Sequence, residues 1–358
     1  MLDSEIVTVV VDDGHFNVKG AIMSESFEPV RYTIPSMVLT GYSNNFLSRS
    51  NDISYDLNTE DVDGKTNFYN VVSKLDFGSN EFLLDTQNSE FQLSAANRVL
   101  VHSMLYHMGL KGKKVRLYAT SPMQRYFHSD GSVNEDYIKQ RNDNLKKPVF
   151  LKDNSTIEIV EVTQIPEGFA TYLSILMKPN KAKGTINIDT SVTREDVLIL
   201  DFGGQTLDVA VVSNGKLVVQ KSYTEEGMGM LKIHDRLYDY LKSYRRNISR
   251  EEMSRVIETG VFATDKKGTN KINVAEKVHK VVRDVLSAAM DKVSKRTPTH
   301  EFDRVIIGGG GAQIIEREIK LYIDGAEMVS DPLHSNAIGT LYMATSEVSA
   351  SQKNAEPA

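Results

Sequence analysis

Residues 7–23 read VTVVVDDGHFNVKGAIM, and residues 196–212 read DVLILDFGGQTLDVAVV. Each stretch is an apolar strand pattern, an aspartate, a short turn that contains glycine, and a second apolar strand pattern. Superposing the two stretches aligns three pairs of residues: Asp12 with Asp201, Gly14 with Gly203, and Asn17 with Thr206. A turn repeated so far apart in one chain predicts two similar half-domains that face one ligand.

The two turns have the composition of a site for phosphate and a cation. Glycine allows positive φ and the close approach of other atoms, and a tight turn can direct several N–H groups into one anion-binding concavity. A carboxylate at the strand end can hold Mg²⁺, directly or through water. The alternative is a pair of ordinary β-hairpins with Asp-Gly and Gly-Gly turns, which the match between the two turns disfavours.

Neither turn is one of the commoner phosphate loops. A Walker loop requires G-x-x-x-x-G-K-[ST], and a Rossmann turn requires G-x-G-x-x-G at the start of a helix. Here Val- and Leu-rich alternation follows each turn, which predicts a strand in both places. The pattern therefore excludes the two most common nucleotide-binding folds.

Composition narrows the class of protein further. A length of 358 residues is enough for two domains, and 40% hydrophobic with 25% charged residues is typical of a soluble globular chain. A net charge of −6 disfavours direct contact with DNA or an acidic membrane, and no apolar run is long enough to span a membrane. The absence of cysteine excludes disulfides and thiol chemistry and fits a cytoplasmic location.

Strand and helix patterns alternate along the chain, which predicts an α/β architecture. We expect domain I at residues 1–185, with a β-rich insertion at about 27–94. Domain II is expected at 195–330, with a mostly helical insertion at about 230–298. The polar segment 178–196 between the domains contains Pro, Gly, Lys and Thr, as linkers do.

The remaining helix patterns carry end signals. Residues 94–109 have helical spacing, with Ser94 as N-cap and Gly109 as C-terminal stop. A closing helix at about 335–347 is expected to return to domain I, and residues 348–358 have the composition of a frayed polar tail.

Two further glycine sites follow strand patterns in domain II. Gly308–Gly311 lie between a β-branched strand and a helix, where the backbone can lie flat against a purine or ribose and the helix N-terminus favours an anion. The alternative is a flexible connector. Gly227 and Gly229 open another helix, either as an ordinary helix start or as a wall of the nucleoside pocket.

Two charged residues are candidates near a terminal phosphate. We expect a helix over 166–177 with Pro166 at its first position, so that Glu167 either compensates the helix dipole or orients the water that attacks a γ-phosphate. Lys19 either neutralises phosphate charge as a point cation or is an exposed strand lysine.

These motifs, taken in order, carry a resemblance. VDDGHFNVK, PEGFATY, LDFGGQTLDVAVV and IIGGGGAQII are similar to the first phosphate loop, connecting segment, second phosphate loop and adenosine loop of one superfamily. That superfamily contains actin, the sugar kinases and the heat-shock-chaperone ATPases. YATSPMQRYF, IKQRNDNLKKPVFL and SNAIGTLYM resemble more closely the ParM (StbA) family of plasmid-partition ATPases. The resemblance implies two related ribonuclease-H-like domains that flank a nucleotide cleft.

The resemblance also implies residue roles. Asp12 and Asp201 would position Mg²⁺, with Asp13 as a substitute for Asp12, and Glu167 with Asp201 would serve catalysis. The nucleotide would contact residues from all four glycine sites: Asp12, Asp13, Gly14, His15, Phe16, Asn17, Lys19, Gly203, Gly204, Gln205, Thr206, Gly227, Gly229, Gly308, Gly309 and Gly310. His15 departs from the family, where a small hydroxyl residue is common.

The implied function is an ATPase, with GTP as the alternative nucleotide, that assembles head to tail into filaments. An adaptor protein bound to centromere-like DNA would link the filament to a plasmid, without direct DNA or membrane contact. Three alternatives stay open: a small-molecule kinase, a chaperone-type ATPase, and a filament with another cargo. A chaperone ATPase carries a further substrate-binding domain, where we expect only the polar tail.

Overall fold

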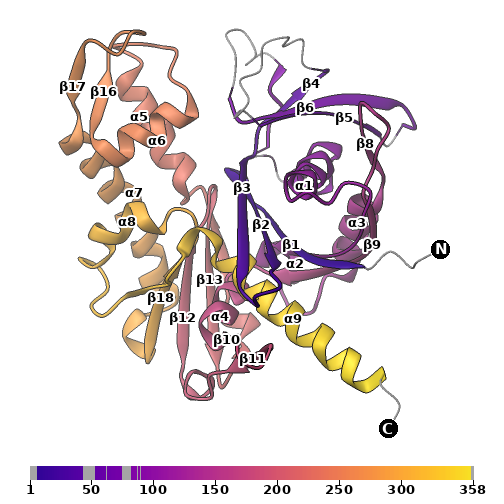
Figure 1. Ribbon diagram of the computed structural model, residues 1–358. Coiled ribbons are helices and arrows are strands. Elements are labelled where there is room, and N and C mark those ends of the chain that lie inside the picture. Colours follow the sequence, from indigo (N-terminus) through magenta and orange to yellow (C-terminus); the bar gives the residue numbers. More distant parts are fainter. Residues whose placement is uncertain are drawn as a thin grey trace. The chain divides into compact units, whose positions relative to one another are not determined.

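The computed structural model describes residues 6–42, 53–61, 63–74, 82–86, 88 and 90–355. The chain divides into two compact units, which are described separately below (Figure 1). Unit 1 contains Met1–Thr193 and His334–Ala358, and unit 2 contains Arg194–Leu333. The chain therefore crosses between the units twice.

The main sheet of unit 1 has the strand order β3-β2-β1-β7-β9. Its strands are β1 (Val7–Asp13), β2 (Asn17–Met23), β3 (Pro29–Pro35), β7 (Lys114–Ser121) and β9 (Glu158–Pro166). β1 is antiparallel to β2 but parallel to β7, which is parallel to β9. The carboxyl ends of β1, β7 and β9 therefore meet at one edge of the sheet, where ligands of open α/β sheets bind.

A second, smaller sheet in unit 1 has the order β4-β6-β5-β8. Its strands are β4 (Val38–Thr40), β5 (Ser54–Glu60), β6 (Thr66–Val72) and β8 (Val149–Leu151). The expected insertion at about 27–94 begins too early, because β3 belongs to the main sheet. The small sheet also takes β8, which lies outside the expected insertion. α1 (Ala95–His107) lies between the two sheets and shares their hydrophobic core (Figure 1).

The other helices of unit 1 are α2 (Met123–Tyr126), α3 (Glu135–Lys146), α4 (Phe169–Leu176) and α9 (Ser335–Ala355). α9 packs on the main sheet through a cluster that includes Val10, Tyr118 and Leu341. The helix continues to Ala355. The expectation of a frayed tail from residue 348 is therefore wrong for residues 348–355. Ala350, Gln352, Lys353 and Ala355 favour a helix, but no apolar stripe in this segment marks one. A hairpin of β10 (Met177–Asn180) and β11 (Thr185–Ile188) ends this part of the chain.

Unit 2 repeats the arrangement around its own hairpin. Its sheet has the order β14-β13-β12-β18-β19, and β15 also pairs with β13. The strands are β12 (Val197–Phe202), β13 (Thr206–Ser213), β14 (Lys216–Leu217), β15 (Tyr223–Glu226), β18 (Arg304–Gly308) and β19 (Glu327–Met328). β12 is antiparallel to β13 and parallel to β18, as β1 is to β2 and β7.

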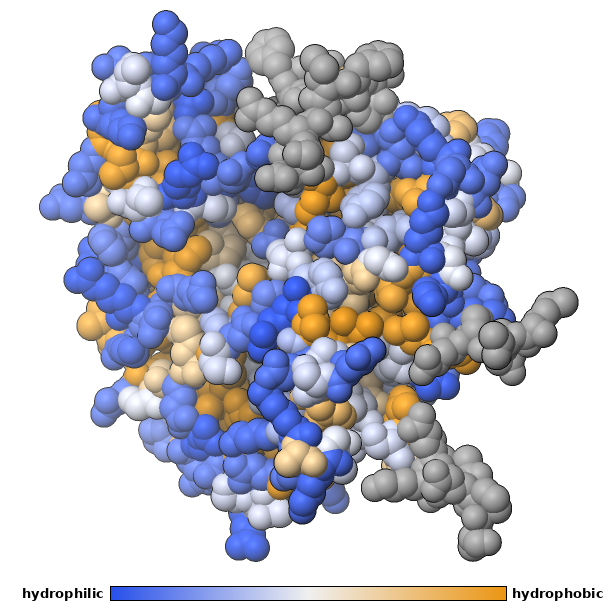
Figure 2. Space-filling view, in the orientation of Figure 1, coloured by the Kyte–Doolittle hydropathy of each residue, from blue (hydrophilic) through white to orange (hydrophobic). Residues whose placement is uncertain are grey.

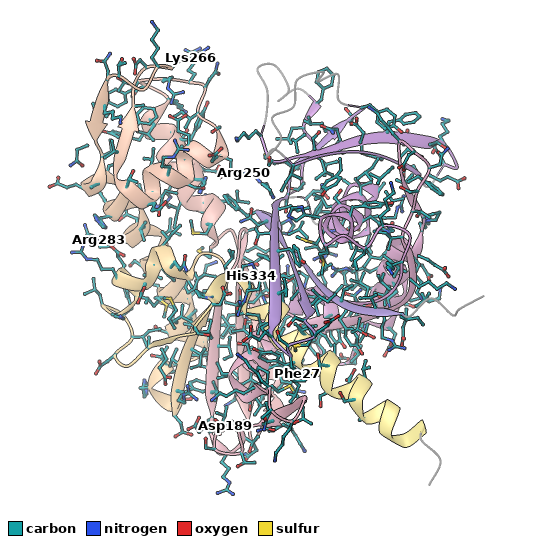
Figure 3. The ribbon with its side chains drawn as sticks, viewed as in Figure 1. Phe27, Asp189, Arg250, Lys266, Arg283 and His334 are labelled. Carbon is teal, nitrogen blue, oxygen red and sulfur yellow. The ribbon has the colours of Figure 1, made fainter. Side chains whose placement is uncertain are left out.

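The rest of unit 2 is mainly helical: α5 (Met230–Leu241), α6 (Arg250–Thr259), α7 (Ala275–Arg296) and α8 (Ala312–Ile319). A short hairpin of β16 (Val261–Ala263) and β17 (Lys271–Asn273), which the sequence patterns missed, carries Lys266 in its turn (Figure 3). Apolar stripes on α5, α6 and α7 share one core with β12 and β13.

Hydrophilic side chains cover most of the face shown in Figure 2, and orange residues occur there in small groups. No helix of the described ranges has the length and apolar character that a membrane span requires.

Candidate functional site

The first turn follows the carboxyl end of β1, and its charged pair is built by strand register. Asp12 lies opposite Lys19 in the β1–β2 ladder, so their side chains share one face of the sheet. Lys19 Nζ lies 3.0 Å from Asp12 Oδ2, and the Thr120 hydroxyl donates to Asp12 Oδ1 at 2.8 Å. The Lys19 side chain is only 12% exposed, so the alternative of an exposed strand lysine is wrong.

The ammonium of Lys19 is directed at the turn itself. A Cβ at Gly14 would lie 2.9 Å from Lys19 Nζ and 3.0 Å from the Asn17 carbonyl oxygen. The Ser36 hydroxyl donates to the Gly14 carbonyl at 2.6 Å and fixes the turn from the other side. A side chain at this position would displace the cation, so the glycine keeps positive charge beside the turn.

Asp13 has a different environment from Asp12, because successive side chains on a strand point to opposite faces. Its carboxylate is almost fully buried and accepts from the Asn97 amide and the Arg141 guanidinium. Both partners lie on helices behind the sheet, α1 and α3. This environment argues against Asp13 as a substitute ligand in place of Asp12.

His15, at the tip of the first turn, contacts the loop before α1. Its Nδ1 is hydrogen-bonded to the carbonyl oxygen of Thr86, and its ring lies 5.5 Å from that of Phe91. Burial lowers the pKa of the imidazole, so the ring is neutral at pH 7. Phe16 and Asn17 complete the turn, and the Phe16 carbonyl accepts from the Ser36 N–H at 3.1 Å.

Glu167 lies at the carboxyl end of β9, at the same sheet edge as Asp12. The expected helix over 166–177 starts late: Pro166 is the last residue of β9, and α4 begins at Phe169 after Gly168 with φ 74°. Glu167 therefore precedes the helix, and its N–H donates to the Ser121 carbonyl at 2.8 Å. Glu167 is therefore beside the N-terminus of α4 but not within its first turn.

The second turn, between β12 and β13, has the same register as the first. Asp201 lies opposite Asp208, as Asp12 lies opposite Lys19. A carboxylate, Asp208, therefore occupies the position that the Lys19 cation has in the first turn, and it accepts hydrogen bonds from the hydroxyls of Thr206 and Thr224. The Gly203 N–H closes the turn on the Thr206 carbonyl at 2.9 Å.

The start of α5 packs directly under this second turn. The backbone N–H groups of Gly229, Met230 and Leu231 donate to the carbonyls of Gln205, Gly203 and Gly204, in that order. A Cβ at Gly229 would lie 2.5 Å from the Gly204 carbonyl oxygen. Gly229 therefore permits this close packing, and Gly227, with φ 68°, turns the chain into the helix.

The glycine run after β18 closes on the aspartate of the second turn. Gly308 pairs with Asp201 in the parallel ladder, and the Gly311 N–H donates to the Phe202 carbonyl at 2.8 Å. Gly309 has φ 85°, and a Cβ there would lie 2.4 Å from Asp201 Oδ1. Gly310 is exposed beside Leu333. Unit 2 thus brings together Asp201, the second turn and the glycine run.

A pocket of about 830 Å³ opens along α8, directly after the glycine run. Polar and apolar side chains from α6, α7 and α8 line it, among them Ser254, Ile257, Glu258, His279, Gln313 and Ile314. Gln313 and Ile314 are in the first turn of α8. A cavity of this size accepts a drug-sized ligand such as a nucleoside. Gly227 and Gly229 do not line it.

The donor set favours a hydrated cation over a protein-caged metal. No group of three or more His, Asp or Glu side chains suited to a metal occurs in the described part of the chain. Asp12 already accepts from Thr120 and Lys19, so a cation would meet it through water. Gln205 Oε1 is buried without a hydrogen-bond partner among the described residues, which leaves an acceptor for a water or hydroxyl. Mg²⁺ commonly retains several waters in this way.

Several of these residues were not found from the sequence: Thr120, Ser121, Arg141, Asp208, Glu258 and Gln313. Thr120 and Ser121 are the last residues of β7, just before Pro122, and site residues of parallel sheets gather at the carboxyl ends of the strands. Asp208 is the strand partner of Asp201, and the superposition that aligns Asp12 with Asp201 also aligns Lys19 with Asp208. Glu258 and Gln313 carry no comparable signal.

Two family models match the chain. The N-terminal domain of the plasmid segregation protein ParM matches residues 7–178, and its C-terminal domain matches residues 192–332. A sequence search finds no match among curated proteins.

Solved structures of low sequence identity share the fold over nearly the whole chain. A non-polymerisable quadruple mutant of pCBH ParM has a TM-score of 0.69 at 19% identity, covering 95% of this chain and 99% of its own. Bacillus thuringiensis ParM with ATP has a TM-score of 0.67 at 18% identity, with coverages of 96% and 99%. Ta0583, an archaeal actin homolog in complex with ADP, has a TM-score of 0.68 at 14% identity, with coverages of 97% and 100%. These likenesses confirm the expected actin-like α/β fold, and the two matched domains show that the chain belongs to the ParM family of actin-like plasmid segregation proteins.

Proposed function

We propose that this chain is an ATPase that polymerises with bound ATP and segregates plasmid DNA through an adaptor protein bound to centromere-like DNA. The observation that carries the proposal is the pair of acid-ended hairpin turns, Asp12 to Asn17 and Asp201 to Thr206, with matching strand registers. Family membership supports the cargo, and a ParM filament from Clostridium botulinum shares the fold at 17% identity and a TM-score of 0.69.

Both turns bind the phosphates of one nucleotide in this proposal. Lys19 neutralises phosphate charge from the first turn, while backbone amides and Gln205 of the second turn donate hydrogen bonds. Asp12 and Asp201 hold Mg²⁺ through water, and the ion, when bound, offsets the charge that develops on the phosphates. The base enters the pocket along α8, where ATP and GTP remain alternatives.

Glu167 is the proposed catalytic acid or base. Its place at the carboxyl end of β9, beside the end of β7, supports a role in orienting the attacking water. Positioning of that water, more than covalent chemistry, is what phosphoryl transfer requires. Hydrolysis then weakens the filament, whose head-to-tail contacts are heterologous and do not close into a ring.

A sedimentation assay tests the proposal. ATP and a non-hydrolysable analogue should give pelletable polymer, and ADP should give less. The Glu167→Ala variant should polymerise but release phosphate slowly. No polymer with any nucleotide across a wide protein range would exclude the filament, and phosphate release that requires a small-molecule acceptor would identify a kinase instead.

A further inference from the structure

Arg141 is a fully buried arginine on an otherwise polar helix. Four buried residues of α3, namely Tyr137, Arg141, Asn144 and Leu145, follow helical spacing and form the face that packs inward. Arginine is almost never fully buried unless it is paired, and the proposed function gives this one no role. Its contacts therefore call for an explanation.

The guanidinium group joins the ends of two parallel strands. One terminal nitrogen forms an ion pair with Asp13 at the end of β1. The other donates at 2.6 Å to the Ser121 hydroxyl at the end of β7. The Ser121 hydroxyl in turn donates to Gln164 Oε1 on β9 at 3.0 Å, so all three carboxyl ends belong to one hydrogen-bonded network.

The same network reaches Glu167. The backbone carbonyl of Ser121 accepts the N–H of Glu167 at 2.8 Å, so the residue that Arg141 holds is the one that anchors this acid. We propose that Arg141 is a positioning residue that fixes the distance between the first turn and Glu167. This inference rests on the proposed function, because it assigns Arg141 a part in the same hydrolysis.

The chemistry of the guanidinium group suits that role. Its planar fork presents donors in fixed directions, whereas the lysine ammonium is a point charge on a flexible stem. A lysine at 141 would keep the ion pair with Asp13 but could not also hold Ser121. Burial alone would lower the pKa of Arg141, but Asp13 and Glu167 raise it, so the group stays charged beneath the turn.

Three variants separate positioning from folding. Arg141→Lys keeps the charge and removes the fork, and Ser121→Ala removes the acceptor while leaving Arg141 and Asp13 paired. Arg98→Lys is the matched control, because Arg98 is equally buried on α1 but binds Thr59 and the Glu60 carbonyl of β5 and Asn144 of α3, and none of these lies at the carboxyl end of β1, β7 or β9. Each variant is assayed as full-length chain for kcat and KM of Mg-ATP hydrolysis, below its unfolding temperature.

We expect Arg141→Lys and Ser121→Ala each to lower kcat about 10- to 100-fold, as misplacement of a reacting group does. KM should change less than about threefold, and the two effects should not add in the double variant. The Arg98→Lys control should keep kcat. If Arg141→Lys fails to fold, Ser121→Ala still decides the question.

Two outcomes overturn the inference in different ways. A folded variant of Arg141 or Ser121 with kcat within about twofold of the parent chain would refute the positioning role alone, and equal losses of kcat in Arg98→Lys would do the same. A parent chain that binds but never hydrolyses a nucleotide would refute the proposed function, and the role of Arg141 with it.

Discussion

Gly309 gives the sharpest test of how unit 2 is built around Asp201. Its φ of 85° lies in the left-handed region, and a Cβ there would lie 2.4 Å from Asp201 Oδ1 and from the Phe202 carbonyl oxygen. Gly309→Ala should therefore have two costs. The left-handed backbone costs about 1 kcal/mol for a residue with a Cβ, and relief of the overlap costs about 1–3 kcal/mol more.

Gly268 supplies the matched control. It has φ 71° in the turn of the β16–β17 hairpin, and a Cβ there would meet nothing within 4 Å. Gly268→Ala therefore has the backbone cost without the overlap. The difference between the two variants isolates the contact of Gly309 with the end of β12.

Calorimetry and nucleotide titration measure both consequences. For a unit of this size, 1 kcal/mol shifts Tm by about 3–4 °C, so we expect a loss of about 3 °C for Gly268→Ala and about 10 °C for Gly309→Ala. Nucleotide binding should weaken only in Gly309→Ala, because only there is Asp201 displaced. Equal Tm losses, with unchanged binding in both, would refute the packing of the glycine run on Asp201.

Three further predictions concern a buried base, the pocket and the first turn. His102 is fully buried with its pKa lowered to about 4 by desolvation, so only the unfolded chain binds a proton as pH falls from about 6.5 to 4. The free energy of unfolding should fall between pH 7 and 4.5 by about 2–3 kcal/mol less in His102→Gln than in the parent chain, as measured by urea unfolding. The same pH dependence in both chains would contradict the burial of a neutral His102. Gln313→Trp should fill the pocket and weaken nucleotide binding about tenfold, whereas Lys216→Trp, at an exposed position of β14 that does not line the pocket, should leave binding unchanged. Equal titration curves for the two variants would refute binding of the base in this pocket. Lys19→Met should cost about 3–5 kcal/mol by leaving Asp12 unpaired, and Asp12→Asn should recover most of it in the double variant; additive losses on urea unfolding would show that the pair is not coupled.

Much of the fold was accessible from local patterns. The two hairpins were predicted with the correct alignment, because apolar alternation and a glycine turn are local features that also determine register. Ser94 accepts the N–H of Asn97 as the expected cap of α1. The place of β3 in the main sheet was missed, because strand pairing depends on contacts that no local pattern records.

The parts of the site that were missed depend on tertiary context. Pro166 fits both the end of a strand and the first turn of a helix, and its pairing with Ser121 in the sheet decided between them. Arg141 lies in the charged segment Glu135–Lys146, whose composition is typical of a solvent-exposed helix. Arg141 has helical spacing to Tyr137 and Leu145, so the sequence does place the three side chains on one face. That this face is buried followed only from the packing of α3 in the structure.

The central claim is that the two turns serve a single nucleotide. Isothermal titration of ATP with Mg²⁺ into the parent chain, Lys19→Met and Thr206→Ala tests it directly, with folding of each variant checked first. The account predicts one nucleotide per chain, bound more weakly when either turn is altered. Binding of two nucleotides per chain would contradict it, and so would a parent-like affinity in either Lys19→Met or Thr206→Ala.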